Sequence, residues 1–334
     1  MAGKVVLTGI KPTGIPHIGN YFGAIRPALG LADNFEARYF IADYHALNSV
    51  QDAATMRDYT YQIAATWIAC GLDPKKVLLY RQSDVPETFE LSTFLMAFTA
   101  KGLMNRAHAY KDAFSKNLEK GVDQDHEINM GLFTYPVLMA ADILLFDTDL
   151  VPVGRDQKQH IEIACDIAQR INHNYGAELL RVPQPVISST LDLIPGLDGR
   201  KMSKSYGNTI PLWLSSKELR KLLMKITTNS QGVEEVKDPD TCNIFALFKL
   251  FSTEEQQAEL AARYRAGGLG WGHAKQALFE VVDAHLAPMR EKYDALIADK
   301  AALDAILDEG ARRARVISAA TMGRLRKAAG LGRG

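Results

Sequence analysis

Two lysines and two hydroxyl side chains fall within the five-residue segment Lys201-Met202-Ser203-Lys204-Ser205, here called the lysine loop. Two ammonium groups three residues apart can neutralise a polyphosphate as negative charge builds up on a leaving group. Gly196, Gly199 and Gly207 flank the segment, which indicates a loop that can move and approach a ligand closely. The alternative is a basic, solvated surface turn, and an isolated Lys-x-x-Lys sequence would favour it.

A second segment, near the N-terminus, has the pattern of an anion site. The apolar run at residues 4–9 predicts a short buried strand. Residues 11–14 form a turn containing proline and glycine, and residues 16–20, here called the histidine turn, open a helical pattern. A strand, a glycine-containing turn and a helix N-terminus present free N–H groups to a phosphate. His17 alone is a weak signal, since a lone histidine is more often structural than catalytic.

Size and composition limit the class of protein. A chain of 334 residues with 47% hydrophobic content can form two domains around a sizeable core. Its net charge is zero, so nucleic-acid binding would depend on local basic patches. The three cysteines are far apart in sequence, which fits a reducing cytosol and excludes a zinc-binding spacing. No signal-type leader is present, and the longest apolar stretch, residues 132–146, is too short to span a bilayer. We expect a soluble cytoplasmic protein.

The order of the predicted elements indicates an α/β fold. Clear helical patterns at residues 53–70 and 156–174 alternate with strand-like runs at residues 4–9, 38–42, 77–81 and 150–153. Such alternation predicts a Rossmann-like parallel sheet covered on both faces. Ligands bind beyond the carboxyl ends of the strands in such sheets. The histidine turn and the turn at Val153 and Gly154 should both lie there.

Two regions are predicted to be helical. Residues 87–146 are read as a helical insertion between the two halves of the nucleotide fold. After Ser215 the strands vanish, and the predicted helices are residues 216–227, 242–251, 253–265, 271–298 and 311–329. The expected domains are therefore residues 1–210, which bind the nucleotide, and an all-helical region, residues 211–334.

Three blocks resemble a known family. The lysine loop is identical to the second signature of class I aminoacyl-tRNA synthetases, and the histidine turn resembles their His-Ile-Gly-His signature, with Asn20 in the fourth place. Residues 131–146 and 151–160 resemble the tryptophanyl-tRNA synthetases of the bacterial type, and the resemblance extends over nearly the whole chain. The tyrosyl-tRNA synthetases, which share the fold and both signatures, are the near alternative.

The resemblance implies a two-step reaction. The carboxylate of L-tryptophan would attack the α-phosphate of ATP and release pyrophosphate, and tryptophan would then pass to tRNA(Trp). Because the attacking carboxylate is already ionised, catalysis needs positioning and charge stabilisation rather than a general base. Mg²⁺ bridging the phosphates is implied, but no dense group of carboxylates marks a metal site held by the protein.

The resemblance also assigns residues to the nucleotide. His17, Asn20, Lys201 and Lys204 are expected to act in catalysis. The residues expected to contact ATP are Lys11, Pro12, Thr13, Gly19, Asn20, Gly154, Arg155, Asp156, Lys201, Met202, Ser203, Lys204 and Ser205. Lys11 replaces the glutamine usual in the bacterial family and adds a cation. Ala113 stands where a second lysine commonly follows Lys111, so it is open which lysine of the insertion serves ATP.

An amino-acid pocket is predicted from spacing. Tyr135, Met139 and Asp142 are four and three residues apart, so on a helix they share one face. Together they would form an indole pocket in which Asp142 accepts the ring N–H. The alternative is a core helix, but a carboxylate within an apolar run needs a specific partner. His45 and Gln157 match family positions that line the substrate pocket.

The remaining expectations concern partners. The family pairs as a homodimer through its catalytic-domain insertion, and its helical C-terminal region reads the anticodon of the tRNA. Residues 311–334 contain no acidic residue and seven basic ones, Arg312, Arg313, Arg315, Arg324, Arg326, Lys327 and Arg333. This segment is therefore the predicted tRNA surface. A small-molecule nucleotidyltransferase and a paralogue that binds tryptophan or RNA without charging tRNA are the alternative functions.

Overall fold

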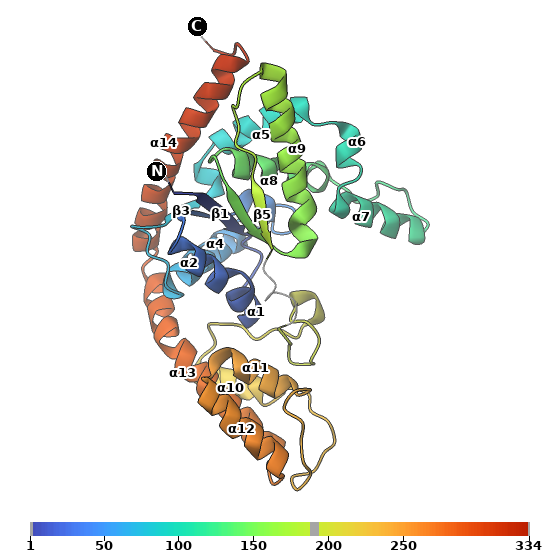
Figure 1. Ribbon diagram of the computed structural model, residues 1–334, viewed down its shortest axis with the longest axis vertical. Helices are drawn as coiled ribbons and strands as arrows, with labels where there is room; N and C mark the ends of the chain where they lie inside the picture. The colour runs from blue at the N-terminus through green and yellow to red at the C-terminus, as the bar shows by residue number, and fades with distance from the viewer. Residues whose placement is uncertain (1–2, 188–193, 333–334) are drawn as a thin grey trace.

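A five-stranded parallel sheet forms the centre of the computed structural model, which describes residues 3–187 and 194–332 (Figure 1). The strands are β1 Val5–Ile10, β2 Glu36–Ile41, β3 Leu78–Arg81, β4 Leu150–Val153 and β5 Gln184–Ile187. Their order in the sheet is β3-β2-β1-β4-β5. The chain therefore reverses its direction of travel across the sheet between β1 and β4. This is the topological switch point, where α/β sheets bind ligands.

The first four strands confirm the sequence prediction, whereas β5 was not predicted. This strand has four residues and pairs in parallel with β4 alone, at the edge of the sheet. It contains Pro185, which has no amide hydrogen and weakens a strand prediction. Its residues are exposed or half-buried, so it lacks the apolar run that revealed the buried strands.

Helices cover both faces of the sheet. The two longest predicted helices near it are confirmed within about two residues, as α4 Ala53–Ala69 and α9 Lys158–Tyr175. The side chain of Asp52 caps α4 by accepting a 2.8 Å hydrogen bond from the amide of Thr55. The shorter elements around the sheet are α1 Ile18–Asn20, a π-helical turn Tyr21–Ile25, α2 Arg26–Ala32, α3 Asp43–Ala46 and the 3-10 turns Gln82–Asp84 and Arg155–Gln157.

The insertion is helical, as predicted. It comprises α5 Glu87–Phe98, α6 Lys101–Met104, α7 His108–Glu119 and α8 Met130–Leu144. Helices α5, α8 and α9 pack together beside the sheet, while α7 projects away from it (Figure 1). Within residues 3–187 and 194–332, none of the helices has both the length and the apolar character needed to cross a bilayer.

The C-terminal region is also helical. Its helices are α10 Ser216–Leu223, α11 Asn243–Phe251, α12 Glu254–Ala266, α13 Trp271–Ala298 and α14 Lys300–Ala328. Helices α10, α11 and α12 form a second lobe, α13 leads back toward the sheet, and α14 packs along β3 (Figure 1). The last helix is therefore much longer than the predicted 311–329, and it belongs beside the sheet.

The predicted start of the last helix, residue 311, was wrong, because α14 begins after its cap, Asp299, and has Gly310 in its interior. A Cβ atom at Gly310 would lie 1.7 Å from the main-chain oxygen of Leu79 in β3. The residue is therefore glycine because the helix backbone touches the sheet backbone at this point.

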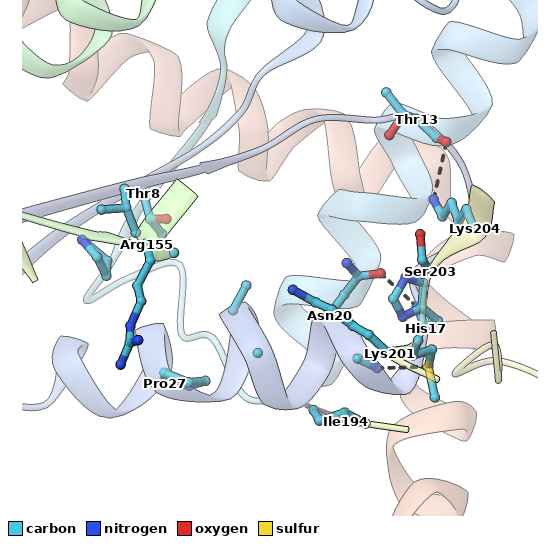
Figure 2. A pocket seen from close by; sticks show the side chains of 17 residues that line it. Thr8, Thr13, His17, Asn20, Pro27, Arg155, Ile194, Lys201, Ser203 and Lys204 are labelled. Carbon is cyan, nitrogen blue, oxygen red and sulfur yellow. Dashed lines mark hydrogen bonds between the residues drawn. The ribbon is translucent and has the colours of Figure 1, made fainter. Parts of the chain in front are cut away.

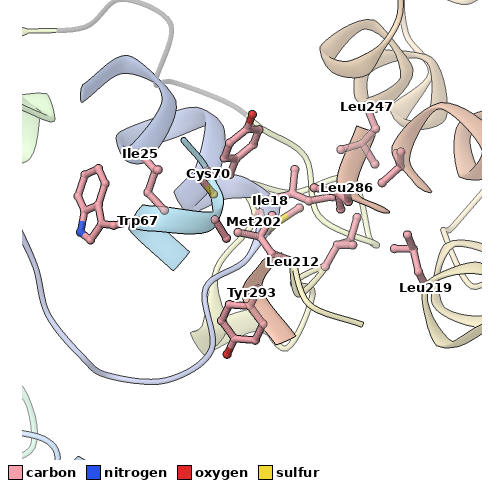
Figure 3. Packing of buried hydrophobic residues seen from close by; sticks show 14 of the residues in the cluster. Ile18, Ile25, Trp67, Cys70, Met202, Leu212, Leu219, Leu247, Leu286 and Tyr293 are labelled. Carbon is pink, nitrogen blue, oxygen red and sulfur yellow. The ribbon is translucent and has the colours of Figure 1, made fainter. Parts of the chain in front are cut away.

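One hydrophobic core joins the sheet to the second lobe. It extends from Trp67 in α4 through Ile18 and Met202 to Leu219 in α10 and Leu286 in α13 (Figure 3). Both Ile18 of the histidine turn and Met202 of the lysine loop are buried in it. The two segments predicted to carry the chemistry are thus anchored in the same core as the second lobe.

Candidate functional site

The lysine loop begins on the return arm of a short hairpin whose turn is formed by residues 196–200. The amide of Met202 donates to the main-chain oxygen of Ile194 over 2.8 Å. The side chain of Asn208 then ties the loop together, since its oxygen accepts from the amide of Ser203 over 2.8 Å and its nitrogen donates to the oxygen of Lys201 over 3.1 Å. The loop therefore has a defined shape that holds Met202 inward and both lysines outward.

The flanking glycines have a packing role that the sequence did not indicate. A Cβ atom at Gly196 would lie 2.4 Å from the side chain of Asn208, and one at Gly199 would lie 2.1 Å from the side-chain nitrogen of Asn243. Gly199 and Gly207 also have positive φ angles, +83° and +63°, which favour glycine. Because these positions are glycine, the hairpin backbone can pack directly against Asn208 and against Asn243 at the start of α11.

The histidine turn is held by its own cap and by the chain that leaves the lysine loop. Within the turn, the amide of His17 donates to the side-chain oxygen of Asn20 over 3.0 Å. Outside it, the amide of Ile18 donates to the oxygen of Ile210 over 2.9 Å, and that of Leu212 donates to Pro16 over 3.0 Å. Residues 16–18 and 210–212, about 190 residues apart in sequence, are thus joined by main-chain hydrogen bonds like those between strands, next to the predicted site.

The two predicted segments meet. The ammonium group of Lys204 donates a 3.2 Å hydrogen bond to the main-chain oxygen of Thr13, and the amide of Gly19 lies 3.3 Å from the sulfur of Met202 (Figure 2). A Cβ atom at Gly19 would lie 2.9 Å from the ring of His17. Glycine is therefore required for the lysine loop and the histidine ring to pack so closely.

Between them lies a cavity of about 780 Å³ at the switch point of the sheet. Thr8 from β1 and Val153 from β4 line its floor. Figure 2 shows Lys201, Ser203 and Lys204 gathered on one side, with Arg155 on the other. The catalytic candidate His17 lines this cavity, as do the predicted ATP contacts Thr13, Gly19, Asn20, Gly154, Arg155, Lys201, Met202, Ser203 and Lys204.

Four predicted ATP residues lie around the cavity rather than in its lining. Lys11 lines a smaller adjoining pocket together with Thr13 and Lys204. Pro12 is buried in the turn, and the hydroxyl of Ser205 is 2.8 Å from that of Ser203. Asp156 belongs to the 3-10 turn that follows β4, and its side chain lies outside the described part of the structure.

Burial and charge set the protonation of the site. Desolvation, reinforced by the positive charge of Lys204, lowers the pKa of His17 to about 4. The imidazole is only 7% exposed, and its Nδ1 atom has no hydrogen-bond partner. Burial of the ammonium end also lowers the pKa of Lys204, although the side chain as a whole stays exposed. At neutral pH His17 is therefore neutral, and the charge available to an anion comes from the lysines and Arg155.

The donor set of this cavity suits phosphate oxygens. Ammonium, guanidinium and amide groups line it, and all of these donate hydrogen bonds to anions. Among the described residues, no group of three or more histidine, cysteine, aspartate or glutamate side chains is arranged to hold a metal ion. The cavity can therefore bind and neutralise a polyphosphate.

Asp142 is the centre of a second polar cluster. Its side chain is buried, and its carboxylate accepts from Gln82 Nε2 at 2.7 and 3.0 Å and lies 2.8 Å from His45 Nε2. The oxygen of Gln82 accepts from the amide of Tyr44 over 3.1 Å, which fixes the orientation of the amide group. Burial raises the pKa of Asp142, and the hydrogen bonds from His45 and Gln82 act against that shift. The expected partner of the buried carboxylate is thus present.

The other predicted pocket residues join this cluster through the next helix. The hydroxyl of Tyr135 hydrogen-bonds His160 Nε2, and His160 Nδ1 is 3.0 Å from the side-chain oxygen of Gln157. The rings of Tyr135 and His45 are 6.3 Å apart in an edge-on arrangement. Met139 is half-buried and packs against the core beneath the sheet. The five residues predicted for tryptophan therefore lie on α3, on α8 and in the 3-10 turn that precedes α9.

Gln82 and His160 are site residues that the sequence reasoning missed. Gln82 directly follows β3, and the rule that ligand groups follow strand ends could have found it. His160 lies three residues after Gln157, one turn further along the helix. Neither residue stands out in the sequence, because each belongs to the cluster only through hydrogen bonds to residues on other elements.

The predicted tRNA surface at the C-terminus is largely paired. In residues 311–332 four arginines form ion pairs with carboxylates, and these pairs are Arg312–Glu309, Arg315–Glu87, Arg324–Asp147 and Arg326–Glu90. Arg313 donates instead to the main-chain oxygen of Pro74. The pairs with Glu87 and Glu90 hold α14 against α5, and together these contacts neutralise much of the charge that a polyanion would meet.

Comparison with known proteins shows the family of this chain. Residues 3–287 match the model of the tRNA synthetases class I (W and Y) family. Tryptophan–tRNA ligase of Xanthomonas axonopodis is 52% identical over 329 residues, which are 98% of this chain and 76% of that protein. Tryptophan–tRNA ligase of Neisseria meningitidis is 49% identical over 334 residues, 99% of both chains.

A solved structure gives the same result for the fold. The crystal structure of tryptophanyl-tRNA synthetase from Campylobacter jejuni, complexed with ADP and tryptophan, superposes with a TM-score of 0.90 at 45% identity. The match covers 98% of this chain and all of that one, 100%. Family model, sequence and fold agree over nearly the whole length. The chain belongs to the class I aminoacyl-tRNA synthetases, within the bacterial tryptophanyl-tRNA synthetase family.

Proposed function

We propose that this chain activates L-tryptophan with ATP to tryptophanyl-adenylate and pyrophosphate, and then transfers tryptophan to tRNA(Trp). One observation carries this function: the lysine loop and the histidine turn meet around a single cavity at the switch point of the sheet. The Asp142 cluster supports the choice of amino acid. ATP is the nucleotide that the family uses.

In the first step the tryptophan carboxylate attacks the α-phosphate, and the bond between the α- and β-phosphates breaks. Negative charge then accumulates on the departing pyrophosphate. Lys201 and Lys204 are the groups on the loop side of the cavity that can neutralise it. His17 stays neutral because its pKa is lowered to about 4, so it can offer a hydrogen bond without taking up a proton from the reaction.

Mg²⁺ would enter this site on the nucleotide. The cavity is lined by cationic and amide donors, which suit phosphate oxygens and leave the metal to be held by the phosphates themselves. When bound, the ion would neutralise part of the triphosphate charge. The residues of this chain that would hold the magnesium–nucleotide complex are Lys201, Ser203 and Lys204 on the lysine loop and Asn20 on the histidine turn.

The amino-acid pocket is proposed to recognise indole through Asp142. Its carboxylate is held by Gln82 and His45, so its orientation is set before the substrate arrives. A carboxylate oxygen has room for more than one donor, and the indole N–H would be the additional one. Tyr135 and Met139 would contact the ring, and Gln157, tied to His160, would contact the polar end of the amino acid.

The assembly and the domain roles are part of the same proposal. Residues 1–210, with the insertion 87–146, would form the catalytic domain, and residues 211–334 would form the helical domain that binds the tRNA anticodon, with α14 returning to the sheet. The insertion is proposed to form a homodimer contact in the cytoplasm, supported by its exposed apolar side chains, which are Phe89, Met96, Leu118, Val122 and Met130.

Amino-acid-dependent exchange of pyrophosphate into ATP tests this function. We expect exchange with tryptophan and a much lower rate with tyrosine at equal concentration. Exchange driven by tyrosine would show that the pocket accepts a phenol and would favour the tyrosyl-tRNA synthetases. Exchange without charging of tRNA(Trp) would show that only the first step is present.

A further inference from the structure

Helix α10 and the residues just after it carry a row of lysines that form no ion pair with an acidic side chain in the part of the chain that the structure describes. Lys217 and Lys221 lie in α10, and Lys225 follows just after it, so the three are spaced four residues apart. Four residues of helix span about 6 Å, and such residues point to the same side. All three are exposed. Leu219 and Leu223 on the opposite side of α10 are buried. The lysine row therefore faces solvent.

The neighbouring acid does not neutralise this row. Glu218 turns back to the N-terminal cap, where it accepts from the amide and the hydroxyl of Ser215 at 3.1 and 2.6 Å. Within the described chain, no ion pair joins Lys217, Lys221 or Lys225 to an acidic side chain. Residues 217–225 therefore hold four cations and one acid, a net charge of +3. The lysines contrast with the paired arginines of α14.

A groove lies beside the lysine row, next to the segment that leaves the lysine loop. Lys221 and Lys225 line a groove of about 360 Å³ together with Glu218, whose carboxylate is held by Ser215, and with Thr209 and Pro211. These last two residues follow the lysine loop, and Pro211 pairs with His17 as a short antiparallel bridge. The groove thus lies between the lysine row and the segment that holds the histidine turn.

We infer that Lys217, Lys221 and Lys225 form a contact surface for the phosphate backbone of tRNA, the substrate of the proposed second step. A polyanion is the partner that matches three exposed, unpaired ammonium groups on a chain with no net charge. The inference rests on the proposed function. It assigns the main electrostatic contact with tRNA to α10 rather than to the C-terminal arginines. It requires no contact between α10 and ATP.

The test replaces the row in the full chain. K217A/K221A/K225A removes three charges and no core side chain. Because each phosphate contact adds roughly 0.7–0.9 to the salt slope of binding, the variant should lose about 2–3 units of slope for a tRNA(Trp) transcript. Between about 50 and 200 mM salt, wild-type affinity should then fall roughly 20- to 40-fold more than that of the variant. Tryptophan-dependent pyrophosphate exchange should be unchanged.

Two matched controls accompany the variant. K217R/K221R/K225R keeps the charge and should keep the wild-type salt slope. K75A/K76A/K120A removes three exposed lysines from the loop before β3 and from the end of α7, and should leave tRNA binding unaltered. In wild-type protein, bound tRNA should protect Lys217, Lys221 and Lys225 from an amine-acetylating reagent, whereas ATP should not.

The outcomes separate this inference from the proposed function. A wild-type protein that charges no tRNA with tryptophan would refute the function. A protein that charges tRNA but shows neither slope loss in K217A/K221A/K225A nor protection of the three lysines would refute the surface. Equal loss of slope in K75A/K76A/K120A would also refute it, because the effect would then follow net charge alone.

Discussion

The ammonium nitrogen of Lys204 lies 3.2 Å from the main-chain oxygen of Thr13, so the lysine loop contacts the turn that precedes His17. Gly14 makes room for it, since a Cβ atom there would lie 3.0 Å from that nitrogen. Charged acceptors form stronger hydrogen bonds than neutral carbonyls. We therefore expect Lys204 to leave Thr13 for the polyphosphate when ATP binds.

Replacing Lys204 tests this transfer. Lys204→Ala should lower kcat for tryptophan-dependent pyrophosphate exchange by roughly 10²–10³ and change the KM for ATP little, because the charge is needed most as pyrophosphate departs. Lys204→Arg, which keeps the charge, should retain more activity than the alanine variant. Turnover of Lys204→Ala close to that of the wild type would remove the lysine from the mechanism.

Gln82 should act through Asp142. Removing one partner of a buried charged group costs about 1–3 kcal/mol, so Gln82→Met should reduce kcat/KM for tryptophan by roughly 5- to 150-fold. A benzothiophene analogue of tryptophan, in which sulfur replaces the indole N–H, should be affected much less, since it does not need the acceptor. In a protein already carrying Asp142→Ala, Gln82→Met should have little further effect.

The comparison of the two substrates decides the role of Gln82. If tryptophan and the analogue lose the same factor, Gln82 only supports the fold. Asp142→Ala on its own should weaken tryptophan activation while leaving the KM for ATP almost unchanged. An unaltered kcat/KM for tryptophan in Asp142→Ala would place this carboxylate outside the amino-acid site.

His17 should make stability depend on pH. Its pKa is about 4 in the folded protein and 6.5 when unfolded, so between these values the unfolded chain binds more protons. The contribution of His17 to the free energy of unfolding should therefore be fully present above pH 6.5 and should decrease as the pH drops. At pH 5 the loss from this group should be about 2 kcal/mol. Urea unfolding at several pH values measures it, and His17→Asn should remove that part of the slope. Equal slopes for both proteins would contradict a buried neutral imidazole.

Two glycines of α14 should respond in opposite ways to alanine. At Gly310 the new Cβ atom would meet the oxygen of Leu79 at 1.7 Å, so Gly310→Ala should destabilise the protein by about 3 kcal/mol or more. At Gly323 nothing lies within 4 Å, and the helix interior favours alanine by up to about 1 kcal/mol. Thermal unfolding of the two variants checks both signs. Similar midpoints would mean that α14 does not rest on β3.

Some features of this protein follow from the sequence alone. The lysine loop and the histidine turn carry their chemistry in residue type and spacing, and the buried strands and long helices are visible in local apolar patterns, as for β1 and α4. These predictions succeed because they depend on neighbours within one or two turns of chain. The prediction that Tyr135, Met139 and Asp142 lie on one helix succeeded for the same reason, because it depends only on their spacing in the sequence.

Other features depend on partners far away in the chain, which no local pattern contains. Strand β5 is stabilised by β4 rather than by an apolar run of its own. Gly310 lies in the interior of α14, at a point where β3 leaves no room for a side chain. Arg326 is matched to Glu90 on another helix, whereas Lys221 meets no acid among the described residues. Only the tertiary fold decides which charges are neutralised, because ion pairing depends on distance in space.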